Sequence, residues 1–381
     1  MARSISWDDL RGLAAVEAAS GCAISVYLNL DPSVVPTPGD AQTRLNSLLD
    51  EAAKSDVATG DGLTHEQRQG IRADFERIRR YFDAEFDRDR ARGLAVFCAG
   101  LDGVWSPISL SEPVADEARV DRRLYLAPLV SLVGRGEGTI VAMVSREQGR
   151  FYRLRAGRLV ELVDLSDEQP GRHDQGGWSQ ARFQRHIDEL ATEHLRAVAG
   201  ELDRLVRRAN GDVDVIVVAP EESRAELAGL LSQPVQRALA GWASAEAHAG
   251  PAELLEVVAP VLEERRARKE EQALDRWRTG AGRAGRSASG WEETLEAASD
   301  GRVETLLASE GADREAWRCP RCGRAAAAEG ACPLDGAPLE RVDKGLDVAI
   351  HLTLVHGGTV CVVRHARDLD PVEGIGALLR Y

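Results

Sequence analysis

Hydrophobic and polar positions along the chain alternate with strand-like and helix-like periods. In the first third, the pattern predicts helices over 7–19, 40–56 and 64–88, and strands over 22–30, 94–98 and 104–110. A proline- and glycine-rich break, Val35-Pro36-Thr37-Pro38-Gly39, separates the first strand from the next helix. We expect an α/β domain over about residues 1–130, whose acidic residues form solvated helix faces rather than a catalytic site.

A second set of alternating elements predicts a central domain over about residues 131–270. Strands are expected over 139–144, 150–154, 158–164 and 213–220, and helices over 178–209, 221–231, 233–243 and 251–279. Asn210-Gly211 is a typical stop signal for the first of these helices. Strands that alternate with helices indicate a central sheet packed with helices.

The last third predicts a further α/β domain over about residues 271–381. We expect a loop or hinge over 283–290, a helix over 291–299, and strands over 302–308, 346–354, 359–363 and 374–381. The final apolar strand is expected to dock in the sheet. The whole chain is therefore predicted to be an α/β protein of three domains, each a mixed sheet packed with helices, with a small insert at about 315–343.

A glycine-rich stretch, residues 171–183, joins a strand to the long helix of the central domain. The adjacent Gly176 and Gly177 permit positive φ and a close approach of the backbone to a partner. Ser179 or Asp174 is expected to cap the helix. The helix carries arginines at spacings that share faces: Arg182, Arg185, Arg196, Arg204, Arg207 and Arg208. The alternatives are a plain turn and a loop that presses against RNA.

Charge and composition narrow the classes of partner. The net charge of −14 argues against a protein that simply coats nucleic acid, although it permits local basic surfaces. Nearly all cations are arginine, which favours bidentate phosphate contacts and is also typical of a GC-rich genome. No stretch has the roughly 20 apolar residues that a membrane helix needs, and the N-terminus lacks a signal-peptide core. We expect a cytoplasmic protein.

The six cysteines fall into two groups. Cys22, Cys98 and Cys361 lie singly in apolar runs and are interpreted as reduced core residues. The other three cluster, and two residues separate Cys319 from Cys322, as in a zinc knuckle. A second turn repeats the form from Cys332, with Asp335 where a fourth cysteine would stand. Zn²⁺ held by these four residues and a decayed ribbon held by its own packing are the two alternatives. His186 and His194 are interpreted as exposed helix positions.

Four features together resemble the bacterial branch of the archaeo-eukaryotic class-I peptide release factor superfamily. They are the Gly176-Gly177 loop with Ser179 and Arg182-Phe183, the stretch from Trp291 to Leu307, the zinc-ribbon-like insert, and the terminal stretch from Gly374 to Tyr381. The resemblance is good over the second and third domains and poor over the first. It implies a third domain with the fold of kink-turn-binding ribosomal proteins, and a protein that enters the ribosomal A site.

The resemblance also implies roles for the glycine loop. Family enzymes have glutamine after the glycine pair, where it positions water at the peptidyl-tRNA ester; this chain has Trp178 there. Gln175 and Gln180 flank the loop outside the expected position. The first domain has no Asn-Ile-Lys-Ser stop-codon signature, which argues against codon-dependent termination. The residues implied to contact ribosomal RNA are His173, Gly176, Gly177, Trp178, Ser179, Gln180, Arg182 and Arg185.

Within this superfamily the sequence is most similar to Balon-type ribosome hibernation factors, including mycobacterial relatives. That similarity implies a non-catalytic protein in the vacant A site, with ribosomal RNA as its partner and elongation factor Tu and tRNA as further candidates; DNA and membranes are not expected partners. The alternative is a peptidyl-tRNA ester hydrolase that acts on stalled ribosomes, with Gln175 or Gln180 as the water-positioning residue. A third is an interaction protein that no longer binds the ribosome.

Overall fold

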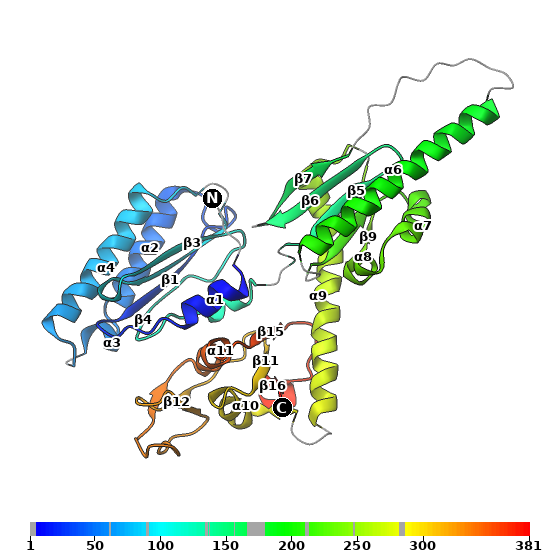
Figure 1. The fold of residues 1–381 in the computed structure, drawn as a ribbon. Helices are drawn as coiled ribbons and strands as arrows, with labels where there is room; N and C mark the ends of the chain where they lie inside the picture. The colour runs from blue at the N-terminus through cyan, green and yellow to red at the C-terminus, as the bar shows by residue number, and fades with distance from the viewer. Residues whose placement is uncertain are drawn as a thin grey trace. The chain divides into compact units, whose positions relative to one another are not determined.

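The computed structural model divides the chain into two compact units (Figure 1). We call them the split unit, Met1–Gly134 with Ala267–Tyr381, and the central unit, Arg135–Arg266. The structure describes residues 5–60, 62–88, 91–133, 136, 138–155, 157–165, 180–209, 213–246, 248–281 and 286–381; for 180–188 and 281 it describes the backbone alone. No helix among these residues combines the length and apolar character needed to cross a bilayer.

The N-terminal part of the split unit is a four-stranded antiparallel sheet with helices on both faces. Its strands are β1 (Ala23–Asn29), β2 (Gly93–Ala99), β3 (Val104–Leu110) and β4 (Glu117–Asp121), in the order β3-β2-β1-β4. Its helices are α1 (Trp7–Ala14), α2 (Pro38–Ala52), α3 (Asp56–Thr59), α4 (His65–Ala84) and α5 (Ala127–Val130), with the short η1 (Gly100–Asp102). Capping boxes begin α1, α2 and α4 at Ser6, Thr37 and Thr64.

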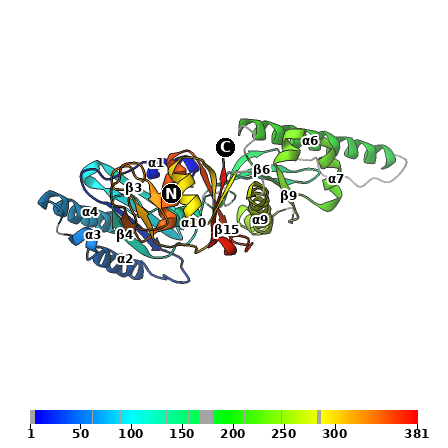
Figure 2. The same cartoon turned by 90° about the horizontal axis from the view of Figure 1, so that it is seen from below.

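The two faces of this sheet bury different sets of side chains. Leu45 of α2 and Phe75 of α4 pack with Val26 and Val96 on one face. Helix α1 covers the other face, where its apolar residues join a larger core. Figures 1 and 2 show α2 and α4 together on the side of the sheet away from α1. Successive residues of β1 therefore serve separate cores: Ile24, Val26 and Leu28 pack on the side of α2 and α4, and Tyr27 packs on the side of α1.

The C-terminal part is a second four-stranded sheet. Its strands are β10 (Ser287–Ser289), β11 (Val303–Ser309), β15 (Thr359–Val363) and β16 (Ile375–Leu379), in the order β10-β16-β11-β15. Its helices are α10 (Gly290–Ser299) and α11 (Gly345–Val355), with the short η2 (Asp370–Val372). Leu274 and Trp277, near the end of α9 (Pro251–Ala281), pack with Leu307 and Leu378 on one face. The sheet is mixed, because β15 is parallel to β11 and β16 is antiparallel to it.

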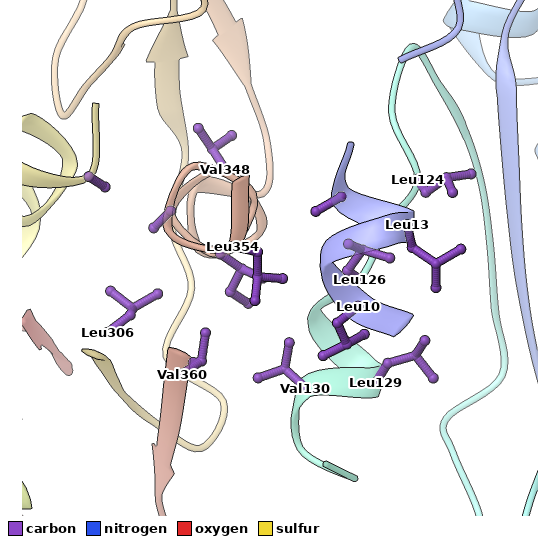
Figure 3. Packing of buried hydrophobic residues seen from close by; sticks show 14 of the residues in the cluster. Leu10, Leu13, Leu124, Leu126, Leu129, Val130, Leu306, Val348, Leu354 and Val360 are labelled. Atoms are coloured by element: carbon purple, nitrogen blue, oxygen red, sulfur yellow. The ribbon is translucent and has the colours of Figure 1, made fainter. Parts of the chain in front are cut away.

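One hydrophobic core joins the two parts of the split unit. Figure 3 shows α1, with Leu10 and Leu13, facing α11, with Val348 and Leu354. At the same seam, the carboxylate of Asp347 accepts hydrogen bonds from the backbone amides of Leu126 (2.8 Å) and Ala127 (2.9 Å). The ring nitrogens of His351, one turn later, lie 2.6 Å from the Leu124 carbonyl and 3.3 Å from that of Ala14. Apolar burial and these polar contacts together fix α11 against the N-terminal part.

A small three-stranded sheet extends from the C-terminal part. It contains β12 (Ala316–Arg318), β13 (Ala325–Ala326) and β14 (Glu340–Val342), in the order β13-β12-β14 and all antiparallel. We call residues 316–342 the insert. The side chains of Ala316 and Ala325 belong to the main core, whereas the far end buries only Cys319, Cys332 and Ala337, with Leu339 packed against them.

The central unit is a five-stranded sheet between helices. Its strands are β5 (Ile140–Val144), β6 (Gly149–Arg155), β7 (Arg158–Asp164), β8 (Val215–Val218) and β9 (Leu239–Ala243), in the order β7-β6-β5-β8-β9. Helices α6 (Gln180–Arg208), α7 (Glu221–Leu230) and α8 (Gln233–Ala238) bury one face of the sheet, and the first half of α9 buries the other. The three strands β5, β8 and β9 are parallel, as expected for strands joined through helices.

The mixed α/β class is confirmed, but three predicted elements are wrong. Residues 346–354 form α11, not a strand; residues 239–243 form β9, not the end of a helix; and residues 287–289 of the predicted hinge form β10. Helix α11 is buried on most sides, so its apolar run lacks the polar face that would have indicated a helix. Strands β9 and β10 are set by pairing with β8 and β16, which local sequence does not reveal.

Candidate functional site

Two turns at the far end of the insert have the same backbone form. The first is Cys319-Pro320-Arg321-Cys322-Gly323 and the second is Cys332-Pro333-Leu334-Asp335-Gly336. In each, the amide of the closing glycine donates to the carbonyl of the leading cysteine, at 3.0 Å in the first turn and 2.9 Å in the second. Both glycines have φ near +70°, at 77° and 70°, where a side chain would be strained. The shared form puts Asp335 at the position that Cys322 holds in the first turn.

The two turns bring four possible ligand atoms together. The three sulfurs of Cys319, Cys322 and Cys332 and a carboxylate oxygen of Asp335 all lie within 4.8 Å of one another. The Cys322 and Cys332 sulfurs are 3.5 Å apart, and the Cys319 thiol donates to Asp335 at 3.3 Å. Cys319 and Cys332 are buried, whereas Cys322 and Asp335 are exposed. A ligand bound here would therefore contact the two buried cysteines on one side and be open to solvent on the other.

The backbone favours negative charge at this cluster. Burial opposes ionisation of Cys319, but the amides of Cys322 and Arg321, 3.5 and 3.4 Å from its sulfur, outweigh burial and lower the pKa of this thiol. The pKa of Asp335 is lowered chiefly by the amide of Ala337, 3.0 Å away. The amide of Arg324 favours the Cys322 thiolate, yet desolvation and the adjacent thiols outweigh it and raise its pKa to about 11. Full ionisation of all four groups needs a cation among them.

The donor set fits a tetrahedral metal ion. Zinc–sulfur bonds of about 2.3 Å in a tetrahedron separate the sulfurs by about 3.8 Å, close to the 3.5 Å between Cys322 and Cys332. Thiolates select soft or borderline ions such as Zn²⁺, and a carboxylate oxygen is an acceptable fourth ligand. The amides directed at Cys319 and Asp335 would orient these two ligands, as hydrogen bonds around metal ligands do.

Polar contacts tie the insert to α10. The hydroxyl of Ser299, the last residue of α10, accepts from the amide of Ala325 at 2.9 Å. Arg324 donates to the carboxylate of Asp300 at 2.5 Å, and this pair raises the pKa of Arg324. The turn after Cys322 is thereby fixed to the main body of the split unit, so the cluster has a defined position on the C-terminal sheet domain.

The predicted RNA-contacting loop falls mostly outside the described residues. His173, Gln175, Gly176, Gly177, Trp178 and Ser179 are among the residues that the structure does not describe. Gln180, Arg182 and Arg185 lie in the first turns of α6, where the backbone alone is described. The long helix after the glycine pair was predicted over 178–209 and is observed over Gln180–Arg208.

The described part of α6 is less basic than the arginine spacing suggested. Arg204 pairs with Glu201, and Arg207 pairs with Asp203 at 2.6 Å, so these two arginines are each matched by an acid one turn away. His194 was predicted to be exposed, and this is wrong: its side chain is 7% exposed and lies on the face of the helix that packs on the sheet. The charge pairs could have been read from the sequence, because the acids stand three or four residues before the arginines.

Comparison with known proteins gives consistent matches. Residues 125–266 match the family model of bacterial archaeo-eukaryotic release factor family 10. Peptide chain release factor subunit 1 of Archaeoglobus fulgidus is 26% identical over 286 residues, which are 68% of this chain and 70% of that protein. The uncharacterised protein Rv2629 of Mycobacterium tuberculosis is 28% identical over 303 residues, 76% of this chain and 78% of that protein.

A structural alignment covers the whole chain but is weak. The crystal structure of Archaeoglobus fulgidus Pelota aligns over 100% of this chain and 93% of its own, with 16% identity and a TM-score of 0.37. A score this low carries no argument about function, so the assignment depends on the sequence matches. Those matches include the segment with the glycine pair and extend over most of the chain. The matches therefore support the resemblance to the bacterial archaeo-eukaryotic release factor-like superfamily that the four sequence features implied.

Proposed function

We propose that this protein is a ribosome-binding hibernation or stress factor of the cytoplasm. In this proposal it occupies the A site and reaches the peptidyl-transferase centre with Gly176 and Gly177, without hydrolysing peptidyl-tRNA. The match to the bacterial archaeo-eukaryotic release factor family model and the relatives named peptide chain release factor subunit 1 support the ribosome as partner. The observation that carries the proposal is Trp178, which stands directly after the glycine pair where family enzymes have glutamine.

Tryptophan and glutamine differ in what they can do to a water molecule. An indole has one N–H donor and no acceptor oxygen, so it cannot hold a water from two sides as a carboxamide does. Its large flat ring can stack on a base, an interaction worth about 1–3 kcal/mol. Trp178 therefore suits binding to ribosomal RNA and does not suit activation of water, which is the combination that a hibernation factor needs.

The other parts of the chain have places in this proposal. The domains would be residues 1–130, 131–270 and 271–381, with the third in the fold of kink-turn-binding ribosomal proteins. The insert would be a zinc ribbon with Zn²⁺ held by Cys319, Cys322, Cys332 and Asp335, whose donor atoms are already grouped. The resemblance to Balon-type factors adds elongation factor Tu and tRNA as candidate partners.

Co-sedimentation with 70S ribosomes tests the proposal. The wild-type protein is expected to pellet with vacant ribosomes from stationary-phase cells and to release no peptide from stalled complexes. Trp178→Ala is expected to weaken pelleting by about tenfold or more, from the lost stacking energy. Glu189→Ala, an exposed change on α6, is the matched control and should pellet like wild type. No binding of the wild-type protein to any ribosome preparation would disprove the proposal.

A second candidate function is hydrolysis of peptidyl-tRNA on stalled ribosomes. It is favoured by the two glutamines that flank the pair, Gln175 and Gln180, since either brings a carboxamide near the loop. This activity would release peptide from stalled complexes, and Gly177→Ala and Gln175→Ala/Gln180→Ala would abolish release. Release that survives in the double glutamine variant, or no release by the wild type above background, would rule it out.

A further inference from the structure

The four donor atoms of the insert sort into two contacts. The Cys319 thiol donates to the Asp335 carboxylate at 3.3 Å, and its sulfur accepts from the amides of Arg321 and Cys322 at 3.4 and 3.5 Å. The sulfurs of Cys322 and Cys332 lie 3.5 Å apart. A thiol and a carboxylate form no covalent bond on oxidation, whereas two thiols form a disulfide. Cys322 and Cys332 are therefore a pair that oxidation can join, while hydrogen bonds hold Cys319 in place.

A small movement brings this pair to bonding distance. A disulfide bond is about 2.05 Å long, so the two sulfurs, now 3.5 Å apart, must approach by about 1.5 Å. Rotation of the exposed Cys322 side chain about χ1 moves its sulfur by this much without displacing the backbone. The two residues are ten positions apart and lie on different turns, so the bond would join the two turns directly.

The exposure of the two cysteines differs in the way that stepwise oxidation requires. Cys322 is exposed and Cys332 is buried beside it. Cysteines that sense oxidants are solvent-accessible and stand next to a second thiol that resolves the first oxidation product. The remaining cysteines belong to the cores of the sheets, where Cys22 and Cys98 are buried and Cys361 is half-buried. An oxidant in solution therefore reaches Cys322 first.

We propose that Cys322 and Cys332 are a peroxide-reactive pair, and that their disulfide withdraws two of the four donors from the metal site. The Cys322 sulfur attacks one oxygen of hydrogen peroxide, the O–O bond breaks, and a sulfenic acid and one water form. The Cys332 sulfur then attacks the sulfenic sulfur, and the S–O bond breaks as the S–S bond forms. The departing hydroxide takes the Cys332 proton as a second water, so two thiols are oxidised and one peroxide is reduced.

The disulfide and the metal site exclude each other. Oxidation leaves only Cys319 and Asp335 as donors, and two ligands do not complete a tetrahedral zinc site. In a metal-bound protein the cysteines are thiolates, which is the form that reacts with peroxide. Thiol reductants reverse a disulfide of this kind, and reversible disulfides of cytosolic proteins are commonly catalytic or redox-sensing. The insert therefore has a reduced state with four donors and an oxidised state with two.

Peptide mapping of the full-length protein tests the proposal. Cleavage after each arginine separates the three cysteines of the cluster, because Cys319 falls in residues 319–321, Cys322 in 322–324 and Cys332 in 325–341. Protein loaded with Zn²⁺ is treated with hydrogen peroxide, blocked with a thiol reagent and digested. We expect the peptides 322–324 and 325–341 to be joined within one chain, and dithiothreitol to separate them. Affinity for Zn²⁺ should fall by more than about a hundredfold in the oxidised protein, since loss of even an outer hydrogen-bond partner costs about 10–100-fold.

Cys361→Ser is the matched control, because this cysteine lies outside the cluster. It should form the same link at the wild-type rate, with the same loss of zinc affinity. A wild type that forms no link, a link through Cys319, or a link between two chains overturns the proposal. Equal zinc binding by the reduced and oxidised proteins also overturns it. None of these measurements involves ribosomes, so their failure leaves the proposed function standing, and a protein that ignores ribosomes can still form the link.

Discussion

The insert and the main core of the split unit are adjacent, but they differ in how much apolar surface they bury. The main core runs through both sheets of the unit and buries whole leucine, valine and tryptophan side chains from α1, α10 and α11. The far end of the insert buries Cys319, Cys332 and Ala337, with partial cover from Leu339. Strands of two or three residues add few hydrogen bonds. Apolar burial accounts for the stability of the main core, whereas the far end of the insert needs a further source of stability.

The difference shows what each region depends on. A core of many interlocking side chains loses a fraction of its stability when one is truncated. A region held by four converging donor atoms and a bound ion loses its shape when one donor is removed, because binding and folding are then the same event. The anchors at Ser299 and Asp300 hold only the first turn of the insert. The predictions below test this contrast.

The largest effect is expected from removal of a donor in the insert. In the zinc-bound protein, Cys319→Ser should lower zinc affinity by at least about a hundredfold and unfold residues 319–339 locally. Removal of zinc from the wild type with a chelator should unfold the same residues. Hydrogen exchange and zinc content measure this. Cys361→Ser, outside the cluster, should change neither. A wild-type protein that purifies without zinc and still protects these amides would show that packing alone holds the insert.

The next effect is truncation in the main core. Leu295→Ala removes a side chain of α10 that is 0% exposed, and it should lower the free energy of unfolding by about 2–5 kcal/mol without changing the fold. Denaturant unfolding measures the loss. Leu334→Ala, at a position that is 71% exposed in the insert, is the control and should cost almost nothing. Equal losses for the two leucines would contradict the separation of the two regions.

A smaller effect is expected at the polar seam between α11 and the N-terminal part. Asp347→Ala leaves the amides of Leu126 and Ala127 without their acceptor, and it should cost about 1–3 kcal/mol in unfolding free energy. Limited proteolysis near residues 124–130 should become faster as the seam loosens. Asp343→Ala, on an exposed side chain four residues earlier, should leave both measurements near wild type. Wild-type stability of Asp347→Ala would mean that the apolar contacts alone fix the seam.

The smallest effect concerns acid stability of the N-terminal part. The amide and hydroxyl of Ser33, and then Arg92, lower the pKa of Asp31 from 3.8 to about 2. A carboxyl with a depressed pKa stabilises the fold fully above 3.8, and this contribution is lost as the pH falls toward about 2. Asp31→Asn should therefore be less stable at neutral pH and lose less stability between pH 4 and 2. Asp8→Asn, on a carboxylate that is 90% exposed, should keep the wild-type acid profile.

The sequence pattern predicted most strands, including the fully buried β2 and β16, but it missed α11 and β4. Strands β2 and β3 were expected as a pair across residues 101–103, and they pair from Gly93 with Leu110 to Ala99 with Val104. The terminal strand was expected in the sheet, where β16 lies. Helix α11 was missed because an apolar run buried on most sides has neither a period of two nor a polar face. Strand β4 was missed because its residues are polar and its pairing with β1 is tertiary.

At the candidate site, the sequence showed the donors but not their surroundings. The repeated Cys-Pro pattern alone indicates Asp335 as the fourth possible ligand. The amides that point at Cys319 and the tether through Ser299 depend on turns that only the folded chain shows. The sequence thus predicted which residues could be metal ligands, but not the hydrogen bonds that position them.

Strand β16 lies between β10 and β11 although it is translated after every other strand of its sheet. During synthesis, β10, β11 and β15 leave the exit tunnel with a gap where residues 375–379 belong. Because β16 is the strand that pairs with β10, the sheet can close only after residues 375–379 have emerged, and its assembly comes after that of the earlier strands.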